Sequence, residues 1–210
     1  MRKWIIVAAF GLAAFVPGSA FAQQDARSLS LIMLLQNADV QKELTLSDKE
    51  KASLALMEKE NAEASRKLRY ETRRLSREDF AKRREFVKET EKQVLVLIGE
   101  KKYGRLRQIQ NQVLGISMAV VGTEIATKLG VTDEQKAKLV KLRNGATLEL
   151  RGIMLADKSN DGRDPDARRK PMEEFRGRQD AKVMEVMTDG QKAKWKELIG
   201  TPIAYKFTQD

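Results

Sequence analysis

Residues 132–139 read TDEQKAKL and residues 188–195 read TDGQKAKW, so nearly the same eight-residue phrase occurs twice in the chain. In each copy a Thr is followed, after two residues, by a Gln, which is the spacing of a capping box at a helix N-terminus. Thr132 can accept a hydrogen bond from the backbone N–H of Gln135, whose side chain can reach back to the N–H of Thr132. We therefore expect a helix to begin at each copy of the phrase.

Two looser copies of the phrase occur earlier in the chain. Residues 46–50 read LSDKE, in which Ser and Glu keep the capping box. Residues 98–102 read IGEKK, in which Gly99 has no hydroxyl and Lys102 is no acceptor. A cap of this kind contributes about 1 kcal/mol to stability. We assign the motif to helix capping rather than to a site, with the capping residues Ser47, Glu50, Thr132, Gln135, Thr188 and Gln191.

The four phrases belong to two related halves of the chain. Residues 44–57 align with residues 129–142 at an offset of 85, and residues 98–109 align with residues 187–198 at an offset of 89. The change of offset fits a loop insertion in the second half, in the stretch ADKSNDGRDPDA. We infer an internal duplication with a first helical repeat at 23–114, a second helical repeat at 115–203 and a C-terminal tail at 204–210.

The distribution of proline and glycine predicts an all-α protein. No proline occurs between Gln23 and Asp164, and no glycine occurs between Gln23 and Ile98. A β-protein would need these residues in its turns, and the stretch is rich instead in good helix formers. A helix is expected from Asp48, with inward-facing positions at intervals of three and four, and Ser76 offers an N-cap for its partner. The expected fold is one of long helical hairpins, with two related repeats packed into one elongated helical domain.

The N-terminus has the pattern of a secretory signal peptide. Arg2 and Lys3 precede an apolar run at residues 4–16, and a small-x-small cleavage site follows at Ala20 and Ala22. This pattern predicts a signal peptide at residues 1–22, cleaved after Ala22, and a periplasmic or secreted protein. The apolar run is shorter than the about 20 residues of a membrane-spanning helix. No later segment is long and apolar enough to span a bilayer, so we expect no transmembrane segment after cleavage.

The chain contains no Cys and no His, which excludes the common nucleophile–histidine systems and most transition-metal sites. DKSNDG at residues 157–162 resembles the start of a calcium loop, but the twelfth position is Arg168 where a bidentate Glu is needed. The Met residues are dispersed, and carboxylate pairs such as Glu58 and Glu60 point to different helix faces. We expect no enzymatic activity, no metal and no cofactor.

The phrase is similar to the LTXXQ signature of the CpxP/Spy-like periplasmic proteins. It stands here as VTDEQ at residues 131–135 and MTDGQ at residues 187–191. The resemblance implies an exported, wholly helical protein, often dimeric, whose cradle of long curved helices has a basic concave face with apolar patches. Spy-like members act as ATP-independent chaperones, and CpxP-like members inhibit an envelope-stress sensor kinase. This chain is longer and duplicated, so we expect either a monomer with pseudo-dimeric halves or a homodimer.

Residues 66–84 form the most basic stretch, with nine Lys or Arg against three acids. It is either a solvated helix face with intrahelical ion pairs or a patch that attracts acidic or unfolded chains. A nucleic-acid partner is disfavoured, because only two aromatic side chains accompany the charge. The candidate client-binding residues are Arg66, Arg69, Tyr70, Arg73, Arg74, Arg77, Phe80, Arg83 and Arg84.

Together these patterns favour a binding protein over a catalyst. The expected function is that of an exported, ATP-independent chaperone-like protein that holds partly unfolded envelope clients on a basic, partly apolar helical surface. One alternative is a regulatory partner that docks on one envelope-stress sensor domain, and another is a passive structural protein of the envelope. A chaperone binds many unfolded chains weakly and with salt sensitivity, whereas a regulator binds one folded domain.

Overall fold

A computed structural model of the chain describes residues 31–71, 76–120, 123–157 and 165–203. All regular structure in these residues is helical, which confirms the predicted all-α class. The predicted signal peptide and C-terminal tail lie outside them. A first helical segment at residues 31–36 precedes α2 (Ala38–Glu43), α3 (Asp48–Glu71), α4 (Arg77–Ala119), α5 (Thr123–Leu129), α6 (Asp133–Asp157), α7 (Pro165–Val186) and α8 (Asp189–Ile199).

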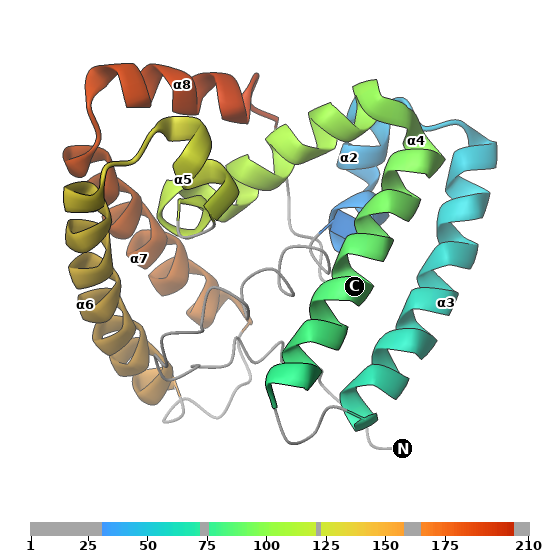
Figure 1. Cartoon of the computed structure of the whole chain (residues 1–210), viewed down its shortest axis with the longest axis horizontal. Helices are drawn as coiled ribbons and strands as arrows, with labels where there is room; N and C mark the ends of the chain where they lie inside the picture. Colours follow the sequence, from blue (N-terminus) through green and yellow to red (C-terminus); the bar gives the residue numbers. More distant parts are fainter. Residues whose placement is uncertain (1–30, 72–75, 121–122, 158–164, 204–210) are drawn as a thin grey trace.

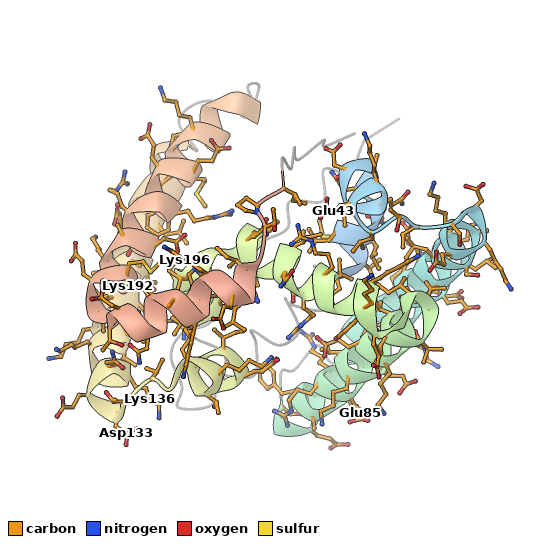
Figure 2. The ribbon with its side chains drawn as sticks, turned by 90° about the horizontal axis from the view of Figure 1, so that it is seen from above. Glu43, Glu85, Asp133, Lys136, Lys192 and Lys196 are labelled. Atoms are coloured by element: carbon orange, nitrogen blue, oxygen red, sulfur yellow. The ribbon has the colours of Figure 1, made fainter. Side chains whose placement is uncertain are left out.

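Two long helical hairpins extend from a common base. Helix α3 packs against the first part of α4, and α6 packs against α7. The base consists of α2, α5, α8 and the part of α4 that follows Gly99. In Figure 1 both hairpins extend from this base toward the same side, and Figure 2 shows from above that they diverge. Within the described residues, no helix is long and apolar enough to cross a membrane.

The apolar core is divided into two clusters, one in each half of the chain. Both lie at the base and along the adjoining part of each hairpin. Burying one side chain of this size contributes about 1.5–3 kcal/mol, so the base and its adjoining turns hold most of the hydrophobic stabilisation. The first cluster includes Leu35, Val40, Leu54, Val94 and Leu106, and the second includes Ile116, Ile125, Leu129, Val183 and Trp195.

Helix α4 belongs to both halves and is bent at two glycines. Gly99 and Gly115 have φ values of 75° and 71°, in the left-handed region that favours glycine. The boundary expected between residues 114 and 115 therefore falls inside α4, at a backbone kink rather than in a linker. At the second kink the Asp180 carboxylate lies against Gly115 and accepts a hydrogen bond from the backbone N–H of Ser117 at 2.9 Å.

The base is closed by hydrogen bonds from α4 to the end of α8 and the segment after it. Gln108 donates to the carbonyl of Glu197 at 3.4 Å, Asn111 donates to that of Leu198 at 3.0 Å, and Gln112 donates to that of Thr201 at 2.8 Å. Gln108 and Glu197 differ by 89 positions, which is the offset between the second pair of aligned segments. Corresponding positions that touch one another are the mark of a two-fold axis, and the predicted duplication requires such a contact in a pseudo-dimer.

Replacing Gly115 by Ala should destabilise the fold by about 1–3 kcal/mol, because a side chain at positive φ is strained and its Cβ would press on the Asp180 carboxylate. Gly104 is the matched control, since it lies in a helical part of α4 with open space around it. Gly104→Ala should instead stabilise by about 0.5–1 kcal/mol. Urea denaturation followed by circular dichroism measures both, and equal effects would contradict the kink.

A chain of residues 23–210 should sediment as a monomer over a wide range of concentration. The self-complementary contact between α4 and α8 is already made within one chain, so a second copy is not needed to close the base. Sedimentation equilibrium measures the mass directly. An obligate homodimer would contradict the pseudo-dimeric arrangement.

Candidate functional site

The two repeated phrases of the second half meet at the base and join their glutamines. The Nε2 of Gln135 donates to the Oε1 of Gln191 at 2.8 Å, and the Nε2 of Gln191 donates back to the Oε1 of Gln135 at 2.9 Å. Gln191 is buried and Gln135 is half-buried. We name this reciprocal pair the glutamine clasp.

Each glutamine of the clasp also serves as a helix cap. The Oε1 of Gln135 accepts from the backbone N–H of Thr132 at 3.1 Å, and the Oε1 of Gln191 accepts from that of Thr188 at 3.0 Å. The backbone N–H groups of the two glutamines donate back to the threonine hydroxyls, which completes both capping boxes. The side-chain amide of Gln135 also donates to the carbonyl of Val186, and that of Gln191 to the carbonyl of Gly130. Every polar atom of this partly buried pair is thus satisfied.

The first half has a charged counterpart at the same positions. Lys102 contacts both carboxylate oxygens of Glu50 at 2.8 Å and also donates to the carbonyl of Thr45 at 3.1 Å. Glu50 accepts from the backbone N–H and the hydroxyl of Ser47, each at 2.7 Å. Hydrogen bonds from Lys102 and then from Ser47 lower the pKa of Glu50 from 4.5 to about 2. We name Ser47, Glu50 and Lys102 the charged clasp.

The two clasps share one backbone contact, made at matching positions. The carbonyl that Lys102 reaches belongs to Thr45, and the one that Gln191 reaches belongs to Gly130, 85 positions later. Both residues have positive φ, 48° and 64°. The sequence indicated only that the copy at residue 98 had lost its capping box. In this copy Lys102 donates to Glu50 in place of a capping side chain. The opposite charges of Lys102 and Glu50, at matching positions of two copies, were the sequence signal for this contact.

The candidate client-binding residues are not gathered into one described surface. Arg66 is exposed on α3. Phe80, Arg83 and Arg84 are half-buried on α4. The side chains of Arg69, Tyr70 and Arg77, and the whole of Arg73 and Arg74, lie outside the part that the structure describes.

Charged side chains cover the outer surfaces of the helices, as Figure 2 shows. Several form pairs along one helix, such as Lys136 with Asp133 at 2.7 Å and Lys192 with Asp189 at 3.2 Å. Exposed pairs of this kind contribute little to stability, so they leave the cations able to meet a partner. Large apolar side chains stand singly among them and include Leu56, Val96 and Leu148, which are 63%, 85% and 73% exposed.

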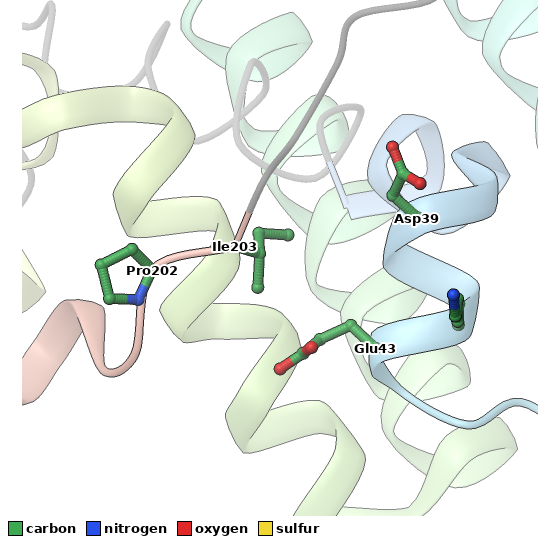
Figure 3. Close-up of a pocket in the computed structure, with 5 residues that line it drawn as sticks. Asp39, Glu43, Pro202 and Ile203 are labelled. Atoms are coloured by element: carbon green, nitrogen blue, oxygen red, sulfur yellow. The ribbon is translucent and has the colours of Figure 1, made fainter.

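Two cavities on the described surface are open to solvent. One of about 420 Å³ lies between α2 and the segment after α8 and is lined by Asp39, Lys42, Glu43, Pro202 and Ile203, four of which Figure 3 labels. The other, of about 240 Å³, lies between α3 and α4. Among the described residues, no group of three or more potential metal-ligating side chains comes together. The described surface therefore offers helix faces and shallow notches for binding.

Comparison with known proteins finds no family model, no curated protein and no solved structure that matches the chain. The function of the protein is therefore inferred from its own residues and their geometry. The features that bear on it are the clasped base, the two projecting hairpins and the mixed charged and apolar surface of those hairpins.

Stability should fall in acid as the charged clasp is lost. Because the folded pKa of Glu50 is about 2 and its ordinary value is 4.5, the carboxylate contributes stability that is present above pH 4.5. This contribution is lost as the pH falls toward 2. The double variant Glu50→Gln, Lys102→Gln copies the neutral clasp of the second half and should lack this component of the pH dependence.

Thermal unfolding of the wild type and of the double variant between pH 5 and pH 2 measures the difference. Either single variant should be less stable at pH 7 than the double variant, by about 1 kcal/mol, because each leaves one partner unmatched. Parallel pH profiles for the wild type and the double variant would show that the clasp does not titrate as described.

Proposed function

We propose that this protein is an exported, ATP-independent chaperone-like protein that holds partly unfolded envelope polypeptides on the surfaces of its two helical hairpins. The observation that carries the proposal is the combination of a clasped base with two projecting hairpins whose surfaces mix charge and isolated apolar side chains. The resemblance of the repeated phrase to the LTXXQ signature points to the same role.

The separation of the stabilising core at the base from the exposed surface of the hairpins supports this proposal. Both clasps and both apolar clusters lie at the base or next to it. The hairpins can therefore present surface to a client without the client disturbing the main core. Exposed Leu56 and Leu148 lie on α3 and α6, one on each hairpin, so each hairpin offers apolar contact.

The charge of the chain supports a role in capturing polypeptides. The formal net charge of +10 falls to +8 when Arg2 and Lys3 leave with the predicted signal peptide. A field of this sign steers acidic, extended chains toward the protein and weakens as salt is added. Weak, salt-sensitive attraction combined with scattered apolar contact suits transient holding better than tight recognition of one ligand.

The shape of the cavities favours an extended client over a small substrate. Small-molecule sites are concave and usually enclose about 300–1,000 Å³. The cavity between α2 and the segment after α8 has a comparable volume but is open to solvent, and its lining combines two acids and a lysine with Pro202 and Ile203. Helix surfaces rather than an enclosed pocket are thus the binding elements of this proposal.

The purified mature chain should suppress aggregation of a chemically unfolded model protein on dilution, without ATP and in near-stoichiometric amounts. Light scattering at low and moderate salt measures this effect. Suppression should be stronger at low salt, because the long-range attraction is screened as ionic strength rises. Unchanged scattering at both salt concentrations would overturn general client binding and favour a single folded partner.

Charge reversal on the hairpin should weaken the suppression. Arg66→Glu with Lys67→Glu changes two exposed cations on α3, and Lys194→Glu with Lys196→Glu makes the same change of net charge at the base. The hairpin variant should require about two- to tenfold more protein for equal suppression at low salt. The base variant should stay close to the wild type. Equal losses in both variants would mean that net charge alone, and not the hairpin, attracts the client.

A further inference from the structure

The two hairpins differ at one matched position, about two-thirds of the way along α3 and α6. In the second hairpin, Glu149 of α6 bridges to three side chains of α7. Its oxygens lie 2.7 Å from Arg178, 2.7 Å from Gln179 and 3.8 Å from Lys182. Hydrogen bonding from Arg178 lowers the pKa of Glu149, which stays ionised at neutral pH. An anion of one helix thus fills the groove between the helices and meets cations of the other.

In the first hairpin no long side chain occupies the matching position. The residue that corresponds to Glu149 at the offset of 85 is Ala64, whose methyl group cannot cross to α4. An open notch of about 240 Å³ lies there. Besides Ala64, its lining consists of Glu60, Asn61, Phe86, Glu89, Thr90 and Gln93.

The floor of the notch is already satisfied by internal hydrogen bonds. Thr90 is only 3% exposed, and its hydroxyl donates to the Oδ1 of Asn61 and lies within hydrogen-bonding distance of the Phe86 carbonyl, both at 2.9 Å. Asn61 in turn donates to the carbonyl of Met57 at 2.9 Å. The notch is therefore a formed feature of the hairpin, with the half-buried Phe86 ring among its lining side chains.

The rim of the notch carries charge of one sign. Glu60 lies on α3 and Glu89 lies on α4, and both are exposed. Glu89 occupies the position of Arg178 in the second hairpin, so the sign of the charge on the second helix is reversed. Glu89 is paired along its own helix with Lys92 at 3.6 Å, a long exposed pair that a better-placed cation can replace.

We propose that this notch binds the cationic end of an arginine or lysine side chain of a bound polypeptide. The guanidinium or ammonium group would lie between Glu60 and Glu89 and bridge the helices, as Glu149 does in the second hairpin with the opposite charge. The aliphatic stem would lie on the Phe86 ring, which also favours a nearby cation. The volume accommodates one long side chain rather than a folded segment. This proposal deepens the proposed function, because it assigns the chemistry of one contact with a client.

Titration with a short Gly/Ser peptide that contains one arginine tests the notch without any aggregation assay. The same peptide with citrulline, which keeps the shape and loses the charge, is the control. Side-chain amide signals of Asn61 and Gln93 in NMR spectra report occupancy. The arginine peptide should shift both signals and bind at least about fivefold more tightly than the citrulline peptide. Equal responses to the two peptides would overturn the proposal.

A triple variant closes the notch by copying the second hairpin into the first. Ala64→Glu, Glu89→Arg and Gln93→Lys reproduce Glu149, Arg178 and Lys182, so the hairpin should stay folded by circular dichroism. Binding of the arginine peptide, followed by the Asn61 signal, should be lost. Glu85→Arg makes the same change of net charge at an exposed position outside the notch, visible in Figure 2, and should leave binding close to the wild-type value.

Two further outcomes separate the notch from the general client-binding role. Retained binding in the triple variant, or an equal loss in Glu85→Arg, would overturn the notch and leave the aggregation result unaffected. A wild-type chain that binds the arginine peptide but does not suppress aggregation would support the notch and overturn the chaperone-like role. Should the triple variant fail to fold, Glu60→Gln with Glu89→Gln removes the rim charge alone and should weaken binding about fivefold or more.

Discussion

The arrangement of the whole molecule depends on satisfying the polar groups at the helix ends of its base. A helix N-terminus leaves backbone N–H groups without partners, and burying them unpaired is costly. Each half brings two copies of one phrase together there. In the second half two glutamines cap their own helices and hydrogen-bond to each other. Capping and helix–helix contact are thus performed by the same four side chains.

The same constraint has a neutral and a charged solution in this protein. The neutral amide pair is insensitive to pH, and each amide both donates and accepts. The charged pair of Glu50 and Lys102 divides these roles, since the carboxylate only accepts and the ammonium only donates. Two side chains with complementary roles replace two with identical roles, and the hydrogen bond to the carbonyl of Thr45 or Gly130 is kept. Either pair can therefore join the helices at the base.

The sequence predicted the helical class, the N-cap at Ser76 and the hydrogen bonds within the phrases, because these depend on local spacing. It did not predict the contact between Glu50 and Lys102 or the kink at Gly115, because both depend on residues more than 50 positions apart. Helix α7 also continues through Pro171, which local rules place at a helix start. Arg83 and Arg84 are half-buried, and a count of charges along the sequence does not contain that information.

The contact of Gln108 with the carbonyl of Glu197 joins two corresponding positions within one polypeptide. In a homodimer every substitution enters both subunits at once, and a change that helps one side of the axis is imposed on the other. A fused pair has no such restriction. One half can hold an ion pair where the other holds a glutamine pair, or an open notch where the other holds an ion-pair network. Dilution, which separates the subunits of a homodimer, leaves such an asymmetric pair intact.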